Sequence, residues 1–281
     1  MKLTKNIKRF IITVALTLGI TSISAYAYDV PICVTVNSNY LEMGEEPFLE
    51  NGITYVPLRF LSDVFNAEDV SWNAHSKQAS VLRDGNNIVV KENSEVAVVD
   101  GKTVRMNGPA VIKNGKLFVP VRFFAESFGA DISWKQKYYR AEISKEGIMP
   151  SDDVITQRGY DDDHIYWLAK IIHCESESES IKGKIGVGNV IVNRVLSDEF
   201  PDTIYNVIFD KKHGVQFQPV LNGSIYKEPG DESYLAAKMV LEGENTAGNS
   251  LYFLNPRIAT NFWIVNNRVF YTSIGNHDFY L

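Results

Sequence analysis

The sequence predicts an α+β protein, in which an N-terminal two-repeat α+β module precedes a mainly helical domain with a small terminal β-sheet. Three observations support this fold class. A strand–helix motif recurs at an offset of 63 residues, two apolar helical patterns follow one another after residue 162, and the chain beyond residue 250 alternates short strand-like runs with turn signals. We expect a signal peptide at 1–27, the repeat module at 28–146, a linker at 147–161 and the helical domain at 162–281.

The first 27 residues have the pattern of a secretory signal peptide, with a basic start, an apolar core and Ala25-Tyr26-Ala27 as the cleavage site. The alternative is an uncleaved membrane anchor, but threonines interrupt the apolar run, and no other segment is long and apolar enough to cross a bilayer. Removing this segment deletes four basic residues and takes the formal net charge from −6 to −10. Nucleic acid is therefore excluded as a partner, because phosphate binding needs clustered Lys and Arg.

The repeat module is predicted from two equivalent segments. Asn51-Gly52 followed by Tyr55-Val56-Pro57 corresponds to Asn114-Gly115 followed by Phe118-Val119-Pro120. Asn-Gly predicts a hairpin turn, the aromatic–Val pair predicts a strand, and the proline predicts the first turn of a short helix. Each repeat is therefore expected to run strand, turn, strand, helix, strand.

A tryptophan recurs near the end of each repeat, as Trp72 and Trp134. An exposed tryptophan can serve as a platform on which a sugar ring stacks. A repeated tryptophan at a helix-to-strand junction more often belongs to the core, so we expect both rings to be buried.

The helical domain begins after a polar stretch whose last aspartates are suited to cap a helix. Ile165, Leu168, Ala169 and Ile172 then recur at helical spacing, so one face is buried, and Glu175 lies one turn beyond them. A carboxyl group at the edge of a core is partly desolvated, which raises its pKa and suits a general acid. The alternative is a frayed helix end with solvated glutamates.

A second apolar helix follows, and Gly183, Gly186 and Gly188 imply that it packs closely on its neighbours. Short helices are expected after Thr203 and Asp231. The tail is expected to form strands, with Gly275-Asn276 as a two-residue hairpin turn.

The helical domain resembles the spore cortex-lytic enzyme and cell wall hydrolase family. The resemblance is carried by motifs in the family's order: Cys174 to Glu179, Gly183 to Gly188, Val192 to Val195, Phe200 to Ile204, Gln216-Phe217, Leu251 to Pro256 and Ile274 to Tyr280. Two segments depart from the usual pattern, because Ser176-Glu177-Ser178 replaces Ala-Arg-Gly and Gln218-Pro219-Val220 is uncommon. The repeat module resembles the copper amine oxidase N-terminal-like domain.

The first resemblance implies a lysozyme-like fold and a lytic transglycosylase that cuts the muramic acid–glucosamine bond of cell wall or spore cortex. Glu175 is the one acid of this region beside a clearly buried helix face. A single carboxyl group can cleave the bond when the substrate's own hydroxyl is the nucleophile. It protonates the leaving oxygen and then takes the proton of the muramic 6-hydroxyl, which attacks the anomeric carbon. The product is a 1,6-anhydro sugar, and no water is consumed.

The other candidate site residues are a second carboxylate and a set of amide and aromatic side chains. Glu179 lies one turn after Glu175 if the helix continues, where it would tune the acid by like-charge repulsion; capping a neighbouring loop is the alternative. Amides and aromatic rings are suited to acetamido groups and sugar rings, respectively, although aromatic residues also fill cores. The candidate substrate-binding residues are Gln216, Phe217, Tyr252, Asn255 and Trp263.

We expect no cofactor and no metal. His75 is the only histidine of the repeat module, so a copper centre is excluded there. His164 and His173 are nine residues apart, whereas two histidines that bind one zinc ion from the same helix face are four apart. This spacing disfavours a zinc amidase. Cys33 and Cys174 lie in different predicted domains and are not expected to pair. We expect Cys174 to be a small buried hydrophobe rather than a nucleophile.

The predicted partners are peptidoglycan glycan strands and a wall-associated protein that binds the repeat module. The predicted location is outside the cell, in the cell wall or spore envelope. Three alternatives remain open: a non-catalytic wall-binding protein, favoured by Glu177 in place of a basic residue; a hydrolytic muramidase or amidase; and a structural protein assembled through its repeats.

Overall fold

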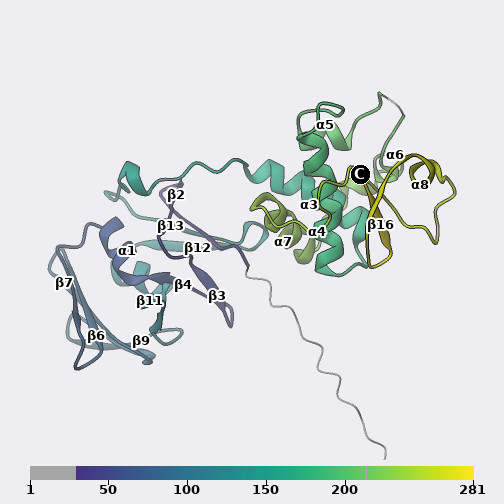
Figure 1. Ribbon diagram of the computed structural model, residues 1–281. Helices are drawn as coiled ribbons and strands as arrows, with labels where there is room; N and C mark the ends of the chain where they lie inside the picture. The colour runs from purple at the N-terminus through teal and green to yellow at the C-terminus, as the bar shows by residue number, and fades with distance from the viewer. Residues whose placement is uncertain (1–29, 213) are drawn as a thin grey trace, which may run out of the picture.

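The computed structural model describes residues 30–212 and 214–281, so the predicted signal peptide lies outside the described residues. Figure 1 shows a β-rich part at the left, coloured purple to teal, and a helical part at the right, coloured green to yellow. The α+β fold class predicted from the sequence is confirmed. Over the described ranges, none of the helices has both the length and the apolar character that a membrane span requires.

The N-terminal module consists of short strands and two short helices. The strands are β1 (Cys33–Val36), β2 (Asn39–Tyr40), β3 (Phe48–Glu50), β4 (Ile53–Pro57), β5 (Asp69–Asn73), β6 (Gln78–Arg83), β7 (Asn86–Lys91), β8 (Val96–Val99), β9 (Lys102–Arg105), β10 (Val111–Lys113), β11 (Lys116–Pro120), β12 (Asp131–Lys135) and β13 (Arg140–Ser144). The helices are α1 (Leu58–Val64) and α2 (Val121–Ser127), with 3₁₀ turns η1 (Gln136–Tyr138) and η2 (Asp152–Val154). The strands form sheets in the orders β12-β13-β1-β2, β10-β11-β4-β3 and β5-β6-β7-β8-β9.

The two repeats are related by an approximate two-fold axis. In the sheet β10-β11-β4-β3, Val56 lies directly opposite Val119, and these two residues are equivalent at the 63-residue offset. Equivalent residues face each other in this way only when the two repeats run antiparallel about a shared axis. The Asn51-Gly52 turn joins β3 to β4 with φ values of 51° and 77°, as the hairpin prediction requires.

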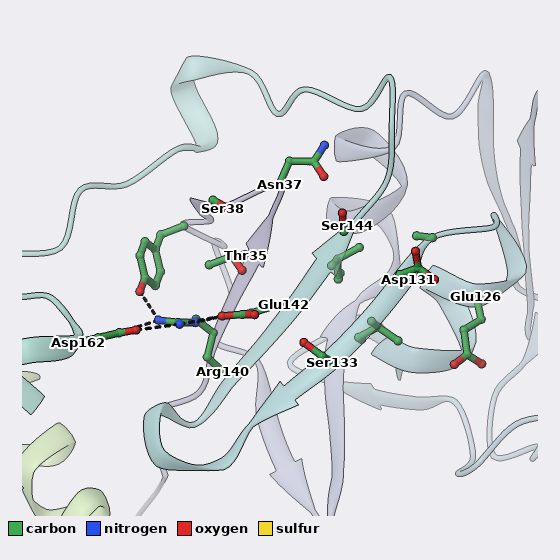
Figure 2. A pocket seen from close by; sticks show the side chains of 14 residues that line it. Thr35, Asn37, Ser38, Glu126, Asp131, Ser133, Arg140, Glu142, Ser144 and Asp162 are labelled. Atoms are coloured by element: carbon green, nitrogen blue, oxygen red, sulfur yellow. Dashed lines mark hydrogen bonds and ion pairs between the residues drawn. The ribbon is translucent and has the colours of Figure 1, made fainter. Parts of the chain in front are cut away.

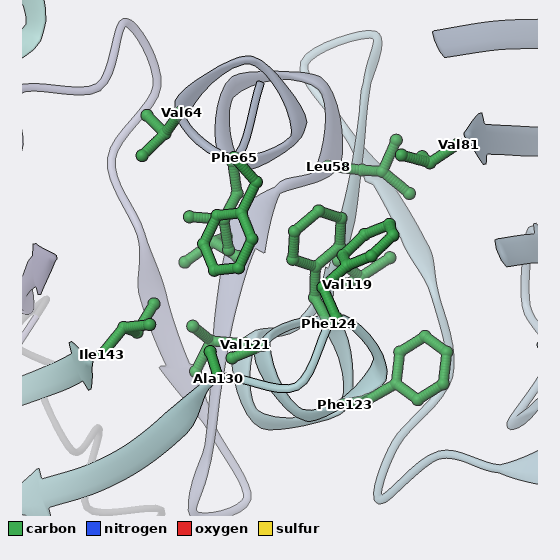
Figure 3. Close-up of a cluster of buried hydrophobic side chains, with 14 of the residues drawn as sticks. Leu58, Val64, Phe65, Val81, Val119, Val121, Phe123, Phe124, Ala130 and Ile143 are labelled. Carbon is green, nitrogen blue, oxygen red and sulfur yellow. The ribbon is translucent and has the colours of Figure 1, made fainter. Parts of the chain in front are cut away.

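The core of the module lies between the two repeat helices (Figure 3). The rings of Phe65 and Phe124 meet edge to face at 5.6 Å, and Phe128 packs on Phe124 at 5.1 Å. Pro57 and Pro120 end their strands and are the N-cap residues of α1 and α2. Each helix therefore begins one residue later than predicted. Their fixed φ still directs the chain from extended strand into helix.

The expectation that both repeated tryptophans are buried is wrong for Trp72, which is 42% exposed. Its strand β5 lies at the edge of the five-stranded sheet, and the pattern of β5 leaves nearly every side chain in contact with solvent. Trp134 is half-buried, donates a hydrogen bond to Gln136 Oε1 at 2.8 Å and meets the ring of Tyr139 at 6.2 Å. The two equivalent positions have therefore diverged.

The C-terminal domain is a helical body with a small sheet. Its elements are α3 (Asp162–Ser176), α4 (Ile181–Val195), α5 (Ile204–Ile208), α6 (Gln218–Asn222), η3 (Ser224–Tyr226), α7 (Asp231–Leu241), β14 (Tyr252–Leu254), α8 (Trp263–Asn267), β15 (Phe270–Ile274) and β16 (His277–Tyr280). Helices α3, α4 and α7 pack together, and the strands form a sheet in the order β14-β16-β15. A Cβ on Gly186 would lie 2.8 Å from the Phe279 ring, and one on Gly188 would lie 2.9 Å from Ile172, so both glycines permit the close packing predicted for α4.

Polar contacts join the two parts of the chain at one end of α3. Arg140, on β13, donates hydrogen bonds of 2.8 and 3.0 Å to the carboxylate of Asp162, the first residue of α3 (Figure 2). The same guanidinium also bonds Glu142 and the hydroxyl of Tyr40. On α7, Lys238 lies 3.6 Å from the Cys33 sulfur of β1. Both cysteines are unpaired, as predicted.

Candidate active site

Glu175 lies near the carboxyl end of α3, where the buried face of the helix reaches the surface. The N-cap of the helix is Asp161, whose side chain accepts a hydrogen bond from His164 N at 3.0 Å. Leu168 and Ile172 are fully buried, and Glu175, one turn on, is partly buried. Burial raises the pKa of Glu175 to about 7, and the positive charge of Arg194 opposes that rise. The sequence predicted this raised pKa and its cause.

Arg194, on α4, is the buried cation beside this acid. It is 6% exposed, and burial lowers its pKa to about 10. Its guanidinium carbon lies 4.9 to 5.5 Å from the ring centres of three aromatic side chains, Phe200, Phe217 and Tyr252. The charge thus takes part of its stabilisation from ring faces in place of water.

The polar side of α4 places β14 next to Arg194. Asn193 donates hydrogen bonds to the carbonyls of Gly248 and Ser250 at 2.8 and 3.0 Å, and Arg194 Nε donates to the Leu251 carbonyl at 2.8 Å. These bonds fix the chain immediately before Tyr252. Two neighbouring residues of α4 therefore hold the strand that carries one of the candidate sugar-stacking rings.

A second arginine extends this row of side chains. Arg268 donates a hydrogen bond of 2.6 Å to the Tyr252 hydroxyl, and its guanidinium lies 4.4 Å from the Tyr252 ring and 5.3 Å from the Trp263 ring. Trp263 is 50% exposed. The fold thus joins Tyr252 and Trp263 through Arg268 and sets Tyr252 against Arg194, whose charge acts on Glu175.

Glu179 does not continue the helix, because α3 ends at Ser176. Its carboxylate is buried and accepts hydrogen bonds from Asn276 Nδ2 at 2.7 Å and from the Asn276 backbone at 3.2 Å. His277 Nδ1 lies 3.8 Å away. Burial raises the pKa of Glu175 and Arg194 opposes that rise, whereas Glu179 has no part in the shift. The geometry therefore favours the loop-capping alternative for Glu179.

The remaining candidates have local contacts. Gln216 is exposed and donates to the Gly214 carbonyl at 3.1 Å. Asn255 accepts from the Arg257 backbone at 3.0 Å within a turn. Phe217 is buried, with its ring against Arg194, so it supports the guanidinium.

Sequence reasoning missed three charged residues of this site: Arg194, Arg268 and Asp210. Asp210 lies close enough to Arg194 to raise the pKa of that guanidinium. The available signal for Arg194 was a single arginine in an apolar glycine-rich helix, which implies a buried charge with a specific partner. Arg268 and Asp210 lie in loops with no periodic pattern, and only the fold places them here.

Five hollows on the described residues, of about 250 to 660 Å³, belong to the repeat module and its junction with the helical domain, and Glu175 lines none of them. Within 30–212 and 214–281, no three His, Cys, Asp or Glu side chains gather closely enough to hold a metal ion. His213 lies outside these ranges.

The chain matches two family models, one in each half. Residues 178–280 match the model described as Cell Wall Hydrolase. Residues 35–143 match the model described as Copper amine oxidase N-terminal domain. Both resemblances expected from the sequence are therefore confirmed. The hydrolase match begins just after Glu175, so the case for Glu175 rests on its own position and environment.

Individual relatives agree with these matches. A spore cortex-lytic enzyme of Oceanobacillus iheyensis is 36% identical over 133 residues, which cover 47% of this chain and 46% of that protein. The solved catalytic domain of the germination-specific lytic transglycosylase SleB from Bacillus anthracis is 35% identical, with 45% of this chain and 100% of that one covered and a TM-score of 0.41. A primary amine oxidase of Klebsiella aerogenes is 33% identical over 73 residues, 26% of this chain and 10% of that one. The chain thus spans about half the length of the spore cortex-lytic relatives it matches.

Proposed function

We propose that the protein is an exported peptidoglycan lytic transglycosylase that cleaves the bond between muramic acid and glucosamine units. The observation that carries the proposal is the pKa of about 7 for Glu175, beside a buried arginine and a row of aromatic rings. A general acid works best when its pKa lies near the working pH, because both protonation states are then accessible. The similarity to spore cortex-lytic enzymes supports cortex or vegetative cell wall as the substrate.

In the proposed reaction Glu175 acts twice. As the neutral acid it protonates the glycosidic oxygen while the C1–O bond breaks, leaving positive charge on the sugar ring. As the carboxylate it then takes the proton of the muramic 6-hydroxyl, whose oxygen bonds to C1 and closes the 1,6-anhydro ring. Arg194 stabilises the carboxylate between these steps, since its charge lowers the Glu175 pKa. The second proton transfer restores the acid.

The surrounding residues supply the binding surface in this proposal. The half-exposed ring of Trp263 offers a stacking face, and Arg268 holds Tyr252 and Trp263 in a fixed relation. Glu179 keeps the β15–β16 turn against the end of α3 and acts as a positioning residue. The proposed division of the chain is that of the sequence analysis, with 162–281 as the catalytic domain.

The reaction is tested by the masses of the products released from purified cortex and from vegetative walls. We expect muropeptides lighter by about 18 Da than hydrolytic ones, because no water is added. Products that all carry the added water would reject the transglycosylase and leave a hydrolytic muramidase. Comparing the two wall types identifies the preferred substrate.

A non-catalytic wall-binding protein is the second candidate, favoured by Glu177 in place of the family's basic residue. Glu177 has a side chain that is 77% exposed and lies 3.9 Å from His173. A protein of this second class would sediment with walls and release no soluble product from them.

A further inference from the structure

The repeat module contains an open hollow that no part of the proposed reaction uses. It lies between α1, β5 and the β10–β11 hairpin and has a volume of about 660 Å³. Its apolar wall is formed by Leu58, Phe60, Trp72, Ile112 and Leu117. Trp72 and Ile112 are each 42% exposed, and over the described residues the Trp72 ring contacts no other aromatic ring and its indole N–H has no hydrogen-bond partner. A large apolar side chain left in solvent on the wall of a hollow is typical of a binding site.

The approximate two-fold axis supplies an internal comparison. The second repeat forms an equivalent hollow between α2, β12 and the β3–β4 hairpin. In its lining, Val121, Arg122 and Trp134 are equivalent to Leu58, Arg59 and Trp72 of the first hollow. That hollow measures only about 250 Å³. Its tryptophan is engaged by Gln136 and Tyr139.

One copy of the duplicated hollow is therefore narrowed by contacts of its own chain, and the other is wider, with its tryptophan free of such contacts among the residues that the structure describes. Both tryptophans lie in the same strand register, since Trp72 pairs with Ala79 and Trp134 pairs with Ala141. The difference thus comes from the side chains around each ring and not from the backbone.

The rim of the open hollow carries charges that balance. Glu45 and Lys116 form an ion pair at 3.2 Å, Arg59 donates to the Val70 carbonyl at 2.9 Å, and Asp63 is exposed. Two cations and two anions give no net charge. Such a rim offers strong donors and acceptors to a neutral ligand that is rich in hydroxyl and amide groups, and it favours neither an acidic nor a basic one.

We propose that this hollow binds the neutral N-acetylglucosamine units of a glycan strand, with one sugar ring stacked on Trp72. A pyranose ring presents C–H groups on its face, which pack on an indole, and its hydroxyls point outward, where the rim side chains lie. The choice of a glycan, in preference to an apolar peptide, rests on the rim charges and on the proposed function of the C-terminal domain. The module then holds the polymer that the other domain cuts, and the two contacts on one strand raise its effective concentration at the catalytic domain.

The direct test follows the indole N–H signals of the ¹⁵N-labelled mature protein during titration with the β-1,4-linked tetramer of N-acetylglucosamine. Trp72→Phe identifies the Trp72 signal by its loss. We expect this signal to move as the tetramer is added, and Trp72→Ala to weaken retention on purified peptidoglycan by about tenfold or more, as truncation of an aromatic anchor does. Trp134→Phe, at the two-fold equivalent position, is the matched control and should retain wild-type binding.

A Trp72 signal that stays fixed with the tetramer, or that moves only with an apolar peptide, would overturn the glycan site. Equal retention of Trp72→Ala and wild type on peptidoglycan would also overturn it. Wall lysis by the wild type, measured in parallel, separates the two proposals. Lysis with a fixed Trp72 signal rejects the glycan site alone, whereas a moving signal without lysis rejects the proposed catalysis alone.

Discussion

At the scale of single residues, two opposing effects set the state of Glu175. Burial alone raises the pKa of a carboxyl group by up to about 3–5 units when it is complete. The rise here is from 4.5 to about 7, because Glu175 keeps some contact with solvent and Arg194 favours its charged form. Burial dominates, and the arginine keeps the value near neutrality.

This balance predicts how stability depends on pH. The folded pKa of Glu175 lies above the unfolded value, so the folded state holds the proton more tightly. Below about pH 4.5 both states are protonated and the group costs nothing; as pH rises through 7 the cost of burying the carboxylate grows to at most about 3 kcal/mol. Glu175→Gln should therefore gain stability relative to wild type between pH 5 and pH 8, measured by urea unfolding. A difference between the two proteins that does not change with pH would show that Glu175 is not desolvated.

The sequence predicted the position of Glu175, because an apolar stripe at helical spacing defines where a buried face ends. It could not reveal Arg194 and Arg268 as neighbours. Arg194 meets Tyr252 across a separation of more than 50 residues, and that contact depends on how β14 packs against α4. The burial of Trp72 was predicted wrongly because a recurring residue implies a recurring structure, whereas only Trp134 is partly covered by side-chain contacts of its own.

At the scale of elements, the β15–β16 hairpin is tied to the turn between α3 and α4. Glu179 occupies the space beside Gly275, where a Cβ would come within 1.9 Å of its carboxylate oxygen. Gly275 also has a φ of 60°, which disfavours any other residue. The hairpin thus needs glycine both for its backbone and for the approach of Glu179.

Gly275→Ala and Gly223→Ala separate these two requirements. Gly223 has a φ of 79° with nothing within 4 Å of the added Cβ, so its substitution costs only the backbone strain, about 1 kcal/mol. Gly275→Ala carries the same strain and also displaces Glu179 from Asn276, so we expect about 2–4 kcal/mol. Chemical unfolding measures both values. Equal losses for the two variants would mean that the Glu179 contact does not hold the hairpin.

Elements with strong local signals were predicted well. The Asn-Gly and Gly-Asn turns, the caps at Asp161 and Thr203 and the apolar stripes all act within a few residues. The end of α3 at Ser176 was not predicted, since the serines and glutamates that follow are compatible with either helix or turn. Helix α8, which carries Trp263, was not predicted, because its short run of aromatic and β-branched residues is compatible with helix or strand.

At the scale of the whole molecule, Arg140 joins the two parts of the chain. Its guanidinium is nearly buried and donates hydrogen bonds to Glu142 and Asp162 (Figure 2). It also donates one to the Tyr40 hydroxyl. A buried charge that loses its partners is costly, so a junction of this kind resists opening. Because Asp162 begins α3, the repeat module is attached to the helix that carries Glu175.

Arg140→Met is therefore expected to uncouple the two parts. Calorimetry should show the unfolding transition of the wild type separating into two, and protease should cut residues 147–161 faster. Lys137→Met removes the more exposed ion pair with Glu228 at the same junction, and it should change neither measurement by much. The coupling by Arg140 would be refuted by a calorimetric profile and a cleavage rate identical to those of wild type.

No sequence pattern predicted this junction. The repeats and the hydrolase motifs each identify one part of the chain, but Arg140 and Asp162 are ordinary surface residues within their own segments. The residues of η2 and the chain after it also bond the module, as in the Thr156 hydrogen bond to the Tyr40 carbonyl at 3.0 Å. Such contacts depend on how the two folded parts meet.

The central claim is that Glu175 donates the proton that breaks the glycosidic bond. The most direct test compares soluble sugar released from purified peptidoglycan by the wild type and by Glu175→Gln, which keeps the size of the side chain and removes its acid. The account predicts that release falls by about 100-fold or more, the usual contribution of a general acid, while binding to the wall is retained. Undiminished release by Glu175→Gln would contradict the account.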